Sequence, residues 1–104
     1  MDEQRWLTFD LFDGHVGEPF EVDVPGGGPV VLRLDAAREG AQPGGRGPDG
    51  AVRLQFSLHF RGPREPVLPQ ATYGVRHDAL GHLDLFLVPV ARDDDGTTYE
   101  AAFA

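Results

Sequence analysis

Residues 52–61 alternate strictly between apolar and polar side chains, and this stretch constrains the fold more than any other part of the chain. A repeat of two is the repeat of a β-strand, which sends successive side chains to opposite faces. One face would meet a core and the other water, as in an antiparallel sheet that is solvated on one side. The apolar members are Val52, Leu54, Phe56, Leu58 and Phe60, and the polar members are Arg53, Gln55, Ser57, His59 and Arg61.

Shorter runs of the same kind predict further strands. They lie at residues 20–24, 30–34, 72–76, 83–88 and 99–103, with turn residues between them. Short connections favour pairing between strands that follow each other in the sequence, as in a meander. We therefore predict a mainly β protein, a small antiparallel β-barrel or β-sandwich of about six strands with one short N-terminal helix.

The N-terminal segment that begins at Thr8 fits either a short helix or a strand, and we favour the helix. Thr8 would serve as its N-cap. Phe9, Phe12 and Val16 follow at spacings of three and four, which place side chains on one face of a helix. Gly17 would end the helix, because glycine adopts the backbone conformation that follows a last turn.

The predicted strand at residues 83–88 is apolar on both faces, since Phe86 and Val88 oppose the leucines. A strand of this kind is covered on both sides, and we expect the N-terminal helix to cover its second face. Pro89 has no backbone N–H, so it is expected to end the strand, to bulge it or to mark an edge.

The chain of 104 residues is long enough for a single domain with a small core, and 40% of its residues are hydrophobic. Residues 38–50 contain five glycines, two prolines and no apolar side chain larger than alanine. This composition does not favour regular structure. We therefore predict one β-rich domain over residues 1–104 that carries a flexible Gly/Pro loop at residues 38–50.

The charge of the chain argues against two classes of partner. Its formal net charge is −8, from 17 acidic and 9 basic residues, whereas nucleic acids and anionic membranes bind basic surfaces. Cysteine is absent, which excludes disulfides, thiolate metal ligands and cysteine nucleophiles. The sequence shows no secretory signal pattern and no apolar stretch of the roughly 20 residues that a membrane helix needs. We expect a cytoplasmic protein by default, and incorporation into a particle stays open.

Two histidines flank a predicted hairpin loop and suggest a metal site. His77 and His82 stand on either side of Asp78, and imidazole and carboxylate groups are the ligand types of zinc. The spacing matches no specific metal-binding motif. The alternative is that these residues are polar decoration at the tip of a hairpin.

Two further positions are candidates for ligand or partner binding. Asp93, Asp94 and Asp95 precede a glycine, but a calcium loop places its acidic residues at alternate positions, so a solvated acidic turn is the alternative. Trp6 is either an anchor for a partner or a lid over the core.

A third hypothesis is a small hydrolase. Ser57 and His59 point the same way from one strand, and Asp84 would complete a triad. The sequence has no nucleophile-elbow motif and no evident oxyanion loop. The alternative is that these polar side chains simply line the exposed face of a strand and have no catalytic role.

Several segments combine into a family pattern. They are residues 7–12, 16–20, 56–63, 68–73 and 99–101, together with the longest, HDALGHLDLFLVPV, at residues 77–90. In these segments the chain resembles an uncharacterised family of short bacterial domains of unknown function, whose members are often encoded beside proteins of the phage tail-collar type. The resemblance covers nearly the whole chain outside the Gly/Pro loop, and it implies no catalytic residue.

The lack of a catalytic constellation and this resemblance favour a function without catalysis. We expect a non-enzymatic protein-interaction or assembly module, associated with a phage-tail-like or surface particle, that uses no cofactor and no metal. Its partner would be another protein, and a homo-oligomer is a second expectation. The alternative is a small ligand- or carbohydrate-binding β domain, with a site at Trp6, at the acidic turn or at the loop between His77 and His82.

Overall fold

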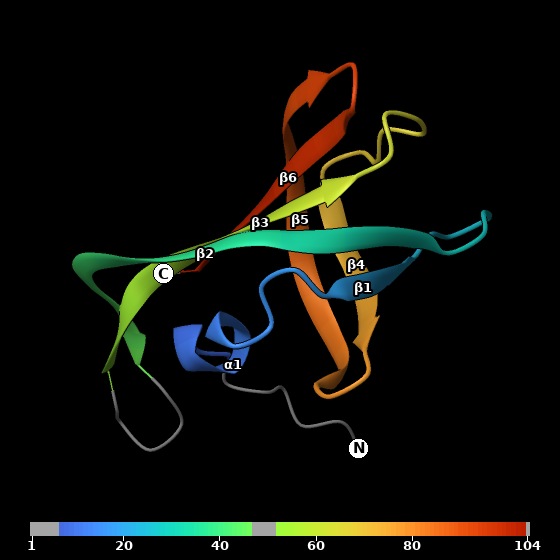
Figure 1. Cartoon of the computed structure of the whole chain (residues 1–104). Helices are drawn as coiled ribbons and strands as arrows, with labels where there is room; N and C mark the ends of the chain where they lie inside the picture. Colours follow the sequence, from blue (N-terminus) through green and yellow to red (C-terminus); the bar gives the residue numbers. More distant parts are fainter. Residues whose placement is uncertain (1–6, 47–51, 104) are drawn as a thin grey trace.

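The computed structural model describes residues 7–46 and 52–103, which form six antiparallel strands and one short helix (Figure 1). The prediction of a mainly β fold with a short N-terminal helix is confirmed. The elements are α1 (Phe9–Asp13), β1 (Pro19–Asp23), β2 (Val30–Arg46), β3 (Val52–Gly62), β4 (Ala71–His77), β5 (Gly81–Asp93) and β6 (Gly96–Phe103).

The strands close into a barrel in the order β1-β2-β3-β6-β5-β4. The prediction of a simple meander was wrong where β3 pairs with β6 and β4 pairs with β1. The segment between β3 and β4 contains Pro63, Pro66 and Pro69, which cannot donate hydrogen bonds to a hairpin ladder. Two three-stranded meanders, β1–β2–β3 and β4–β5–β6, therefore join along their edges.

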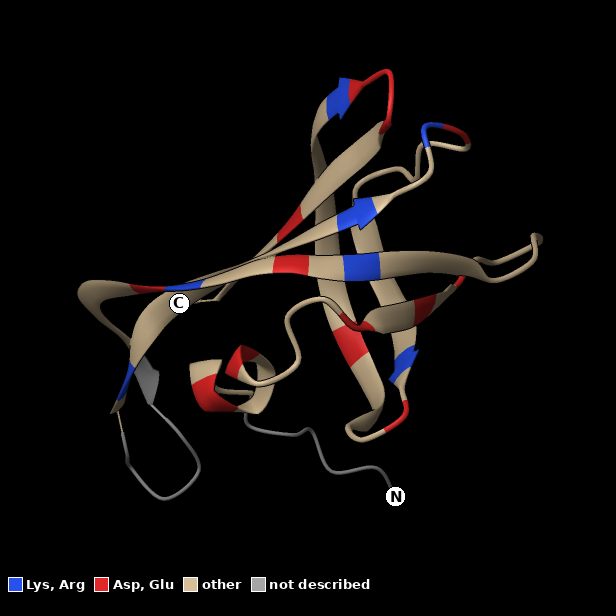
Figure 2. Ribbon diagram, viewed as in Figure 1, with Lys and Arg blue, Asp and Glu red and all other residues tan. Residues whose placement is uncertain are grey.

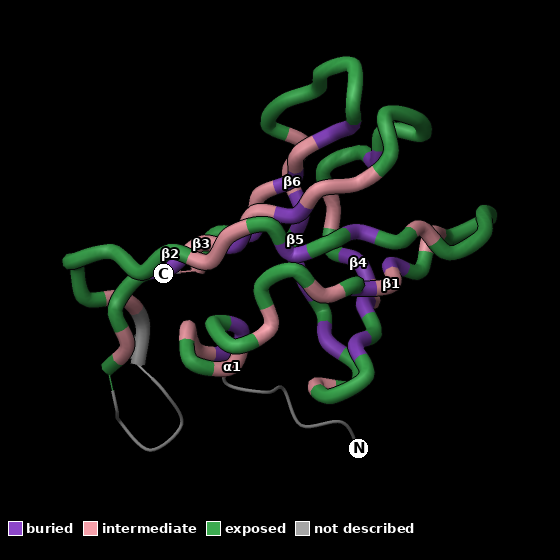
Figure 3. Tube along the Cα trace, viewed as in Figure 1, coloured by how far each residue is buried: buried purple, intermediate pink, exposed green. Residues whose placement is uncertain are grey.

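Buried and exposed residues alternate along much of the barrel strands (Figure 3), and the buried ones form the core. In β3 the predicted alternation is confirmed for Phe56, Leu58 and Phe60, which are at most 3% exposed, whereas Val52 and Leu54 are exposed. The space between the inward side chains has no room for a water molecule, so this part of the interior is a packed core. Its lining residues are Phe20, Val22, Leu32, Phe60, Val75, Leu85 and Leu87.

Residues outside the strands plug the barrel at two places (Figure 1). The Phe12 ring of α1 is fully buried and lies 6.2 Å from the Phe56 ring and 6.3 Å from the Phe103 ring, centroid to centroid. Leu68, between β3 and β4, is 2% exposed, and its backbone N–H donates to the Tyr99 hydroxyl at 2.8 Å. The core is thus closed by the helix and by the connecting segment.

α1 differs from its prediction in length and in what it covers. Thr8 is the N-cap residue without a side-chain capping hydrogen bond, and Gly14 rather than Gly17 follows the last helical residue. The expectation that the helix covers the second face of residues 83–88 was wrong, because Phe86 on that face is 49% exposed. In a closed barrel this face is the outside, and α1 packs at the barrel mouth instead.

β5 continues past Pro89 as far as Asp93, and its pairing with β6 shifts register between Pro89 and Ala91. Of the three roles expected for Pro89, the bulge is confirmed, and so is the edge, because β4 pairs with β5 only as far as Leu87. Val90 lies inside this irregularity and is 49% exposed.

The largest correction concerns residues 38–46, which were predicted as part of a loop and instead extend β2. They pair with β3 as far as Val52, and the register is irregular on both sides of Pro43. The bulges accommodate the glycines. Among the described strands only β3 pairs with this part of β2, so Pro43, which has no N–H, interrupts hydrogen bonds to no other strand. Residues 47–50 of the predicted loop lie outside the described residues, and its flexibility stays a prediction.

Residues 38–46 of β2 and 52–55 of β3 are called the arm below. β2 pairs with β1 only up to Arg33, and β3 pairs with β6 only from Phe56 onward, so the two strands leave the barrel together. Figure 1 shows the arm as a two-stranded ribbon that extends away from β4 and β5. None of its described side chains is buried.

Candidate functional site

Three titratable side chains converge where the segment after α1 meets the end of β4. The Glu18 carboxylate oxygen Oε1 lies 2.8 Å from His15 Nδ1 and 2.7 Å from His77 Nε2. The two imidazole centroids are 4.7 Å apart, edge to face. No other group of three His, Asp or Glu side chains comes this close together in the described part of the chain.

Local backbone geometry presents Glu18 to this cluster. Gly17 has a φ of +95°, a conformation that L side chains rarely adopt, and it turns the chain after α1. The Gly17 N–H donates to the Leu34 carbonyl at 2.7 Å, and the Leu34 N–H donates to the Glu18 carbonyl at 3.1 Å. These bonds fix the backbone of Glu18 to β2 immediately before β1 begins.

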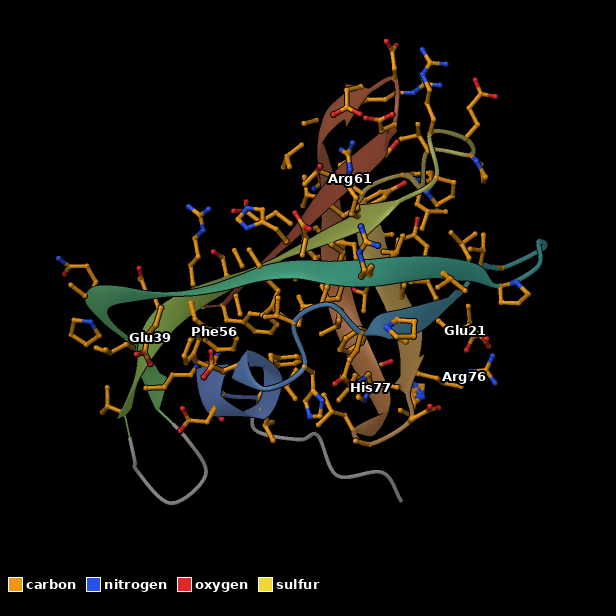
Figure 4. The ribbon with its side chains drawn as sticks, in the orientation of Figure 1. Glu21, Glu39, Phe56, Arg61, Arg76 and His77 are labelled. Atoms are coloured by element: carbon orange, nitrogen blue, oxygen red, sulfur yellow. The ribbon has the colours of Figure 1, made fainter. Side chains whose placement is uncertain are left out.

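His77 is held by hydrogen bonds on both ring nitrogens. Its side chain is 3% exposed, at the position labelled in Figure 4. Nδ1 accepts the backbone N–H groups of Ala79 at 3.0 Å and Leu80 at 3.1 Å. An accepting ring nitrogen carries no hydrogen, so this pattern assigns the proton to Nε2, which donates to Glu18. The Phe20 ring, with its centroid 4.4 Å away, packs against the imidazole.

Glu18 is the anionic member of the cluster. The hydrogen bond from His15, and after it the one from His77, holds the pKa of the Glu18 carboxyl below its ordinary value. The Glu18 side chain is 45% exposed, so solvent screens these interactions. One ionised carboxylate thus accepts from two imidazoles that are distant in sequence.

The proton assignment argues against a metal ion held by all three residues. A metal-binding imidazole gives its lone pair to the ion and usually donates its other N–H to an acceptor. To bind a metal through Nε2, His77 would have to carry its proton on Nδ1. That proton would point at the N–H groups of Ala79 and Leu80, which are donors and not acceptors. The cluster therefore acts as a clamp between the segment before β1 and the β4–β5 turn.

The structure does not bring together the residues predicted to form a metal site in the hairpin. His77 pairs with Gly81 and points inward, whereas His82 pairs with Arg76 and points outward. His82 Nε2 instead lies 3.3 Å from an Asp84 carboxylate oxygen, and Asp78 is exposed in the turn. The two imidazoles therefore lie on opposite faces of the sheet.

His15 and Glu18 were missed by the sequence reasoning. Their separation of three residues is a local signal, but the third member, His77, lies 59 residues beyond Glu18. Only the pairing of β1 with β4 brings these segments together. A single sequence offers no indication of that pairing.

The acidic turn is consistent with a solvated turn, the alternative to a calcium site. Asp93 Oδ1 accepts the backbone N–H of Asp95 at 2.9 Å and that of Gly96 at 3.1 Å, and it forms an ion pair with Arg61. The Arg61 hydrogen bond is the main reason that the pKa of Asp93 lies below its ordinary value. Asp93 thus closes the turn, while Asp94 and Asp95 are exposed.

The remaining candidates are separated by the fold. His59 lies beside Glu100, with Nε2 3.3 Å from Oε2, whereas Asp84 is beside His82 on β5. Ser57 pairs with Ala102, so no predicted Ser–His–Asp triad is assembled among these residues. Trp6 lies outside the described residues.

These features define a class, a small antiparallel β-barrel domain with a filled core and a projecting two-stranded arm. α1, the single helix in the described part of the chain, is too short to traverse a bilayer. The chain belongs to the family described as Domain of unknown function (DUF6916), whose model matches residues 7–103. No curated protein and no solved structure matches the chain.

Proposed function

We propose that the protein is a non-enzymatic protein-interaction module that serves in assembly. The arm carries this proposal. Its residues Val52 and Leu54 are 53% and 39% exposed, although both are apolar members of the alternation in β3. A two-stranded ribbon without a core is marginally stable by itself, and an open strand edge is a template for pairing with another chain.

The rest of the described surface supports binding over catalysis. His15 and His77 each hydrogen-bond to Glu18, and Asp93 is hydrogen-bonded within its turn and paired with Arg61. The packed barrel interior gives the alternative function, a small-ligand or carbohydrate domain, no cavity at its centre. Among the described residues, the exposed aromatic ring of Phe86 is a feature that favours that alternative.

The proposed setting is a phage-tail-like or surface particle of a bacterium, in which this domain contacts another protein. The resemblance in sequence to bacterial domains encoded beside tail-collar proteins suggests this setting. On this proposal the chain is cytoplasmic before it joins the particle, and it uses neither cofactor nor metal.

A photocrosslinking amino acid placed on the arm tests the proposal. Replacing Leu54 with a benzophenone-bearing residue should give one dominant protein adduct in host cells, identified by mass spectrometry and enriched with particles. Val31 is the matched control, because it is 54% exposed on the barrel wall outside the arm. Equal adducts at both positions, or none at Leu54, would contradict the role of the arm. Specific binding on a glycan array, abolished by Phe86→Ala, would favour the alternative function.

A further inference from the structure

The arm differs in charge from the rest of the chain. By sequence it contains Arg38, Arg46 and Arg53 against one acidic residue, Glu39, a formal charge of +2. The chain as a whole carries −8, so the remainder carries −10. Arg38 is exposed and forms no ion pair with a described residue. A surface of this kind is attracted to an acidic, apolar partner surface.

Such a surface exists on the chain itself, at the far end of β5. β4 pairs with β5 only as far as Leu87, so residues 88–93 have no second strand neighbour among the described residues. Val90 on this stretch is 49% exposed. The turn that follows carries Asp94 and Asp95, both exposed and unpaired with any described cation, and Figure 2 shows this turn in red.

The two surfaces complement each other in three respects. Each has a stretch of strand with no second strand neighbour among the described residues, each exposes apolar side chains, and their formal charges are opposite. Figure 1 shows that the arm and the β5–β6 hairpin extend from the barrel in different directions. The arm of one molecule therefore points away from its own β5 stretch, so a strand that pairs with either surface would come from another molecule.

We propose that the arm of one copy pairs along residues 88–93 of β5 in a second copy, with Arg38 near Asp94 and Asp95 of that copy. The inference rests on the proposed function and names its partner as a second copy of this chain. The two surfaces are different, so the contact is heterologous and repeats from copy to copy. The product is a ring if the rotation between copies closes, and a filament if it does not.

Sedimentation velocity of the full chain tests this contact. The wild type should sediment faster as its concentration rises, and raising the salt from about 0.1 M to about 1 M should weaken association, because the charges are exposed. Leu54→Asp on the arm and Val90→Asp on β5 should each raise the dissociation constant by about tenfold or more. Val31→Asp is the matched control and should leave association unchanged, because Val31 belongs to neither surface.

Mixing the two defective variants identifies the heterologous contact. Leu54→Asp retains an intact β5 edge and Val90→Asp retains an intact arm, so the mixture should form a 1:1 dimer that grows no further. A wild type that stays monomeric at millimolar concentration, a mixture that stays monomeric, or disruption by Val31→Asp overturns the proposal. A monomeric chain whose Leu54 crosslinks to a different host protein would overturn this inference and leave the proposed function intact.

Discussion

Glu18 is the residue on which the clamp depends. Its carboxylate accepts from His15 at 2.8 Å and from His77 at 2.7 Å, and the two histidines belong to segments that are distant in sequence. His77 in turn accepts two backbone N–H groups of the β4–β5 turn. A chain of hydrogen bonds therefore runs from the segment after α1 to a hairpin on the other meander, and each member is oriented by the next.

Replacing Glu18 should change how stability depends on pH. The pKa of Glu18 is lower in the folded chain than its ordinary value of 4.5, so the unfolded chain takes up the proton first as the pH falls. The carboxylate therefore adds stability above pH 4.5 and loses that contribution as the pH falls below it. Urea unfolding between about pH 6 and about pH 3 should show a smaller loss of unfolding free energy for Glu18→Gln than for the wild type.

Glu39→Gln is the control for this measurement. Glu39, labelled in Figure 4, is exposed on the arm and forms no ion pair with a described residue. Its variant should follow the wild-type pH dependence. If Glu18→Gln follows it as well, the two histidines do not favour the ionised carboxylate, and the clamp has no energetic consequence.

Individual candidate residues were predictable from the sequence only as far as their strand assignment. Alternation along β3 correctly placed Phe56, Leu58 and Phe60 in the core. The hairpin at residues 77–82 was recognised, but its exact register decides that His77 points inward and His82 outward. A change of one residue in a turn exchanges the two faces of a strand, so the sequence could not assign that geometry.

At the scale of elements, five short strands and β3 were recognised because a period of two is a local property. The arm was not recognised, because glycine and proline disfavour a strand in isolation. The strand that stabilises residues 38–46 by pairing with them is β3, which begins only at Val52. Bulges on both sides of Pro43 let β2 keep pairing with β3 despite those residues. Composition alone therefore underestimated the length of β2.

The meeting of the β5–β6 turn with the end of β3 leads to a prediction about packing. A Cβ atom at Gly96 would collide with the backbone oxygen of Gly62, which cannot rotate away as a side chain can. Gly96→Ala should therefore lower the free energy of unfolding by about 1–3 kcal/mol, measured by urea denaturation. Gly28→Ala is the control, because a Cβ there has no neighbour within 4 Å, and it should stay within about 0.5 kcal/mol of the wild type. Equal stability of the two variants would contradict the close approach.

At the scale of the whole molecule, the barrel depends on two contacts between meanders that the sequence did not reveal. β3 and β6 share seven residue pairs, from Phe56↔Phe103 to Gly62↔Thr97. β1 and β4 share three, and Arg76 on β4 bonds to both Glu21 and Asp23 across that contact. Strand edges far apart in sequence meet because a closed barrel gives every strand two neighbouring strands. Closure depends on the complete set of strands and cannot be recognised from any one of them.

This architecture predicts that the two meanders unfold together, because each buries its apolar face against the other. Leu58 on β3 and Leu85 on β5 belong to different meanders, and each is at most 1% exposed. Leu58→Ala and Leu85→Ala should each cost about 2–5 kcal/mol and lower the urea midpoint of the entire molecule with little change in the slope of the transition. Amide signals of both meanders, followed by NMR through the titration, should disappear at one midpoint in each variant and in the wild type. Signals of β4 and β5 that outlast those of β1 and β3 would show that the meanders are separate folding units and that the barrel contacts add little to stability.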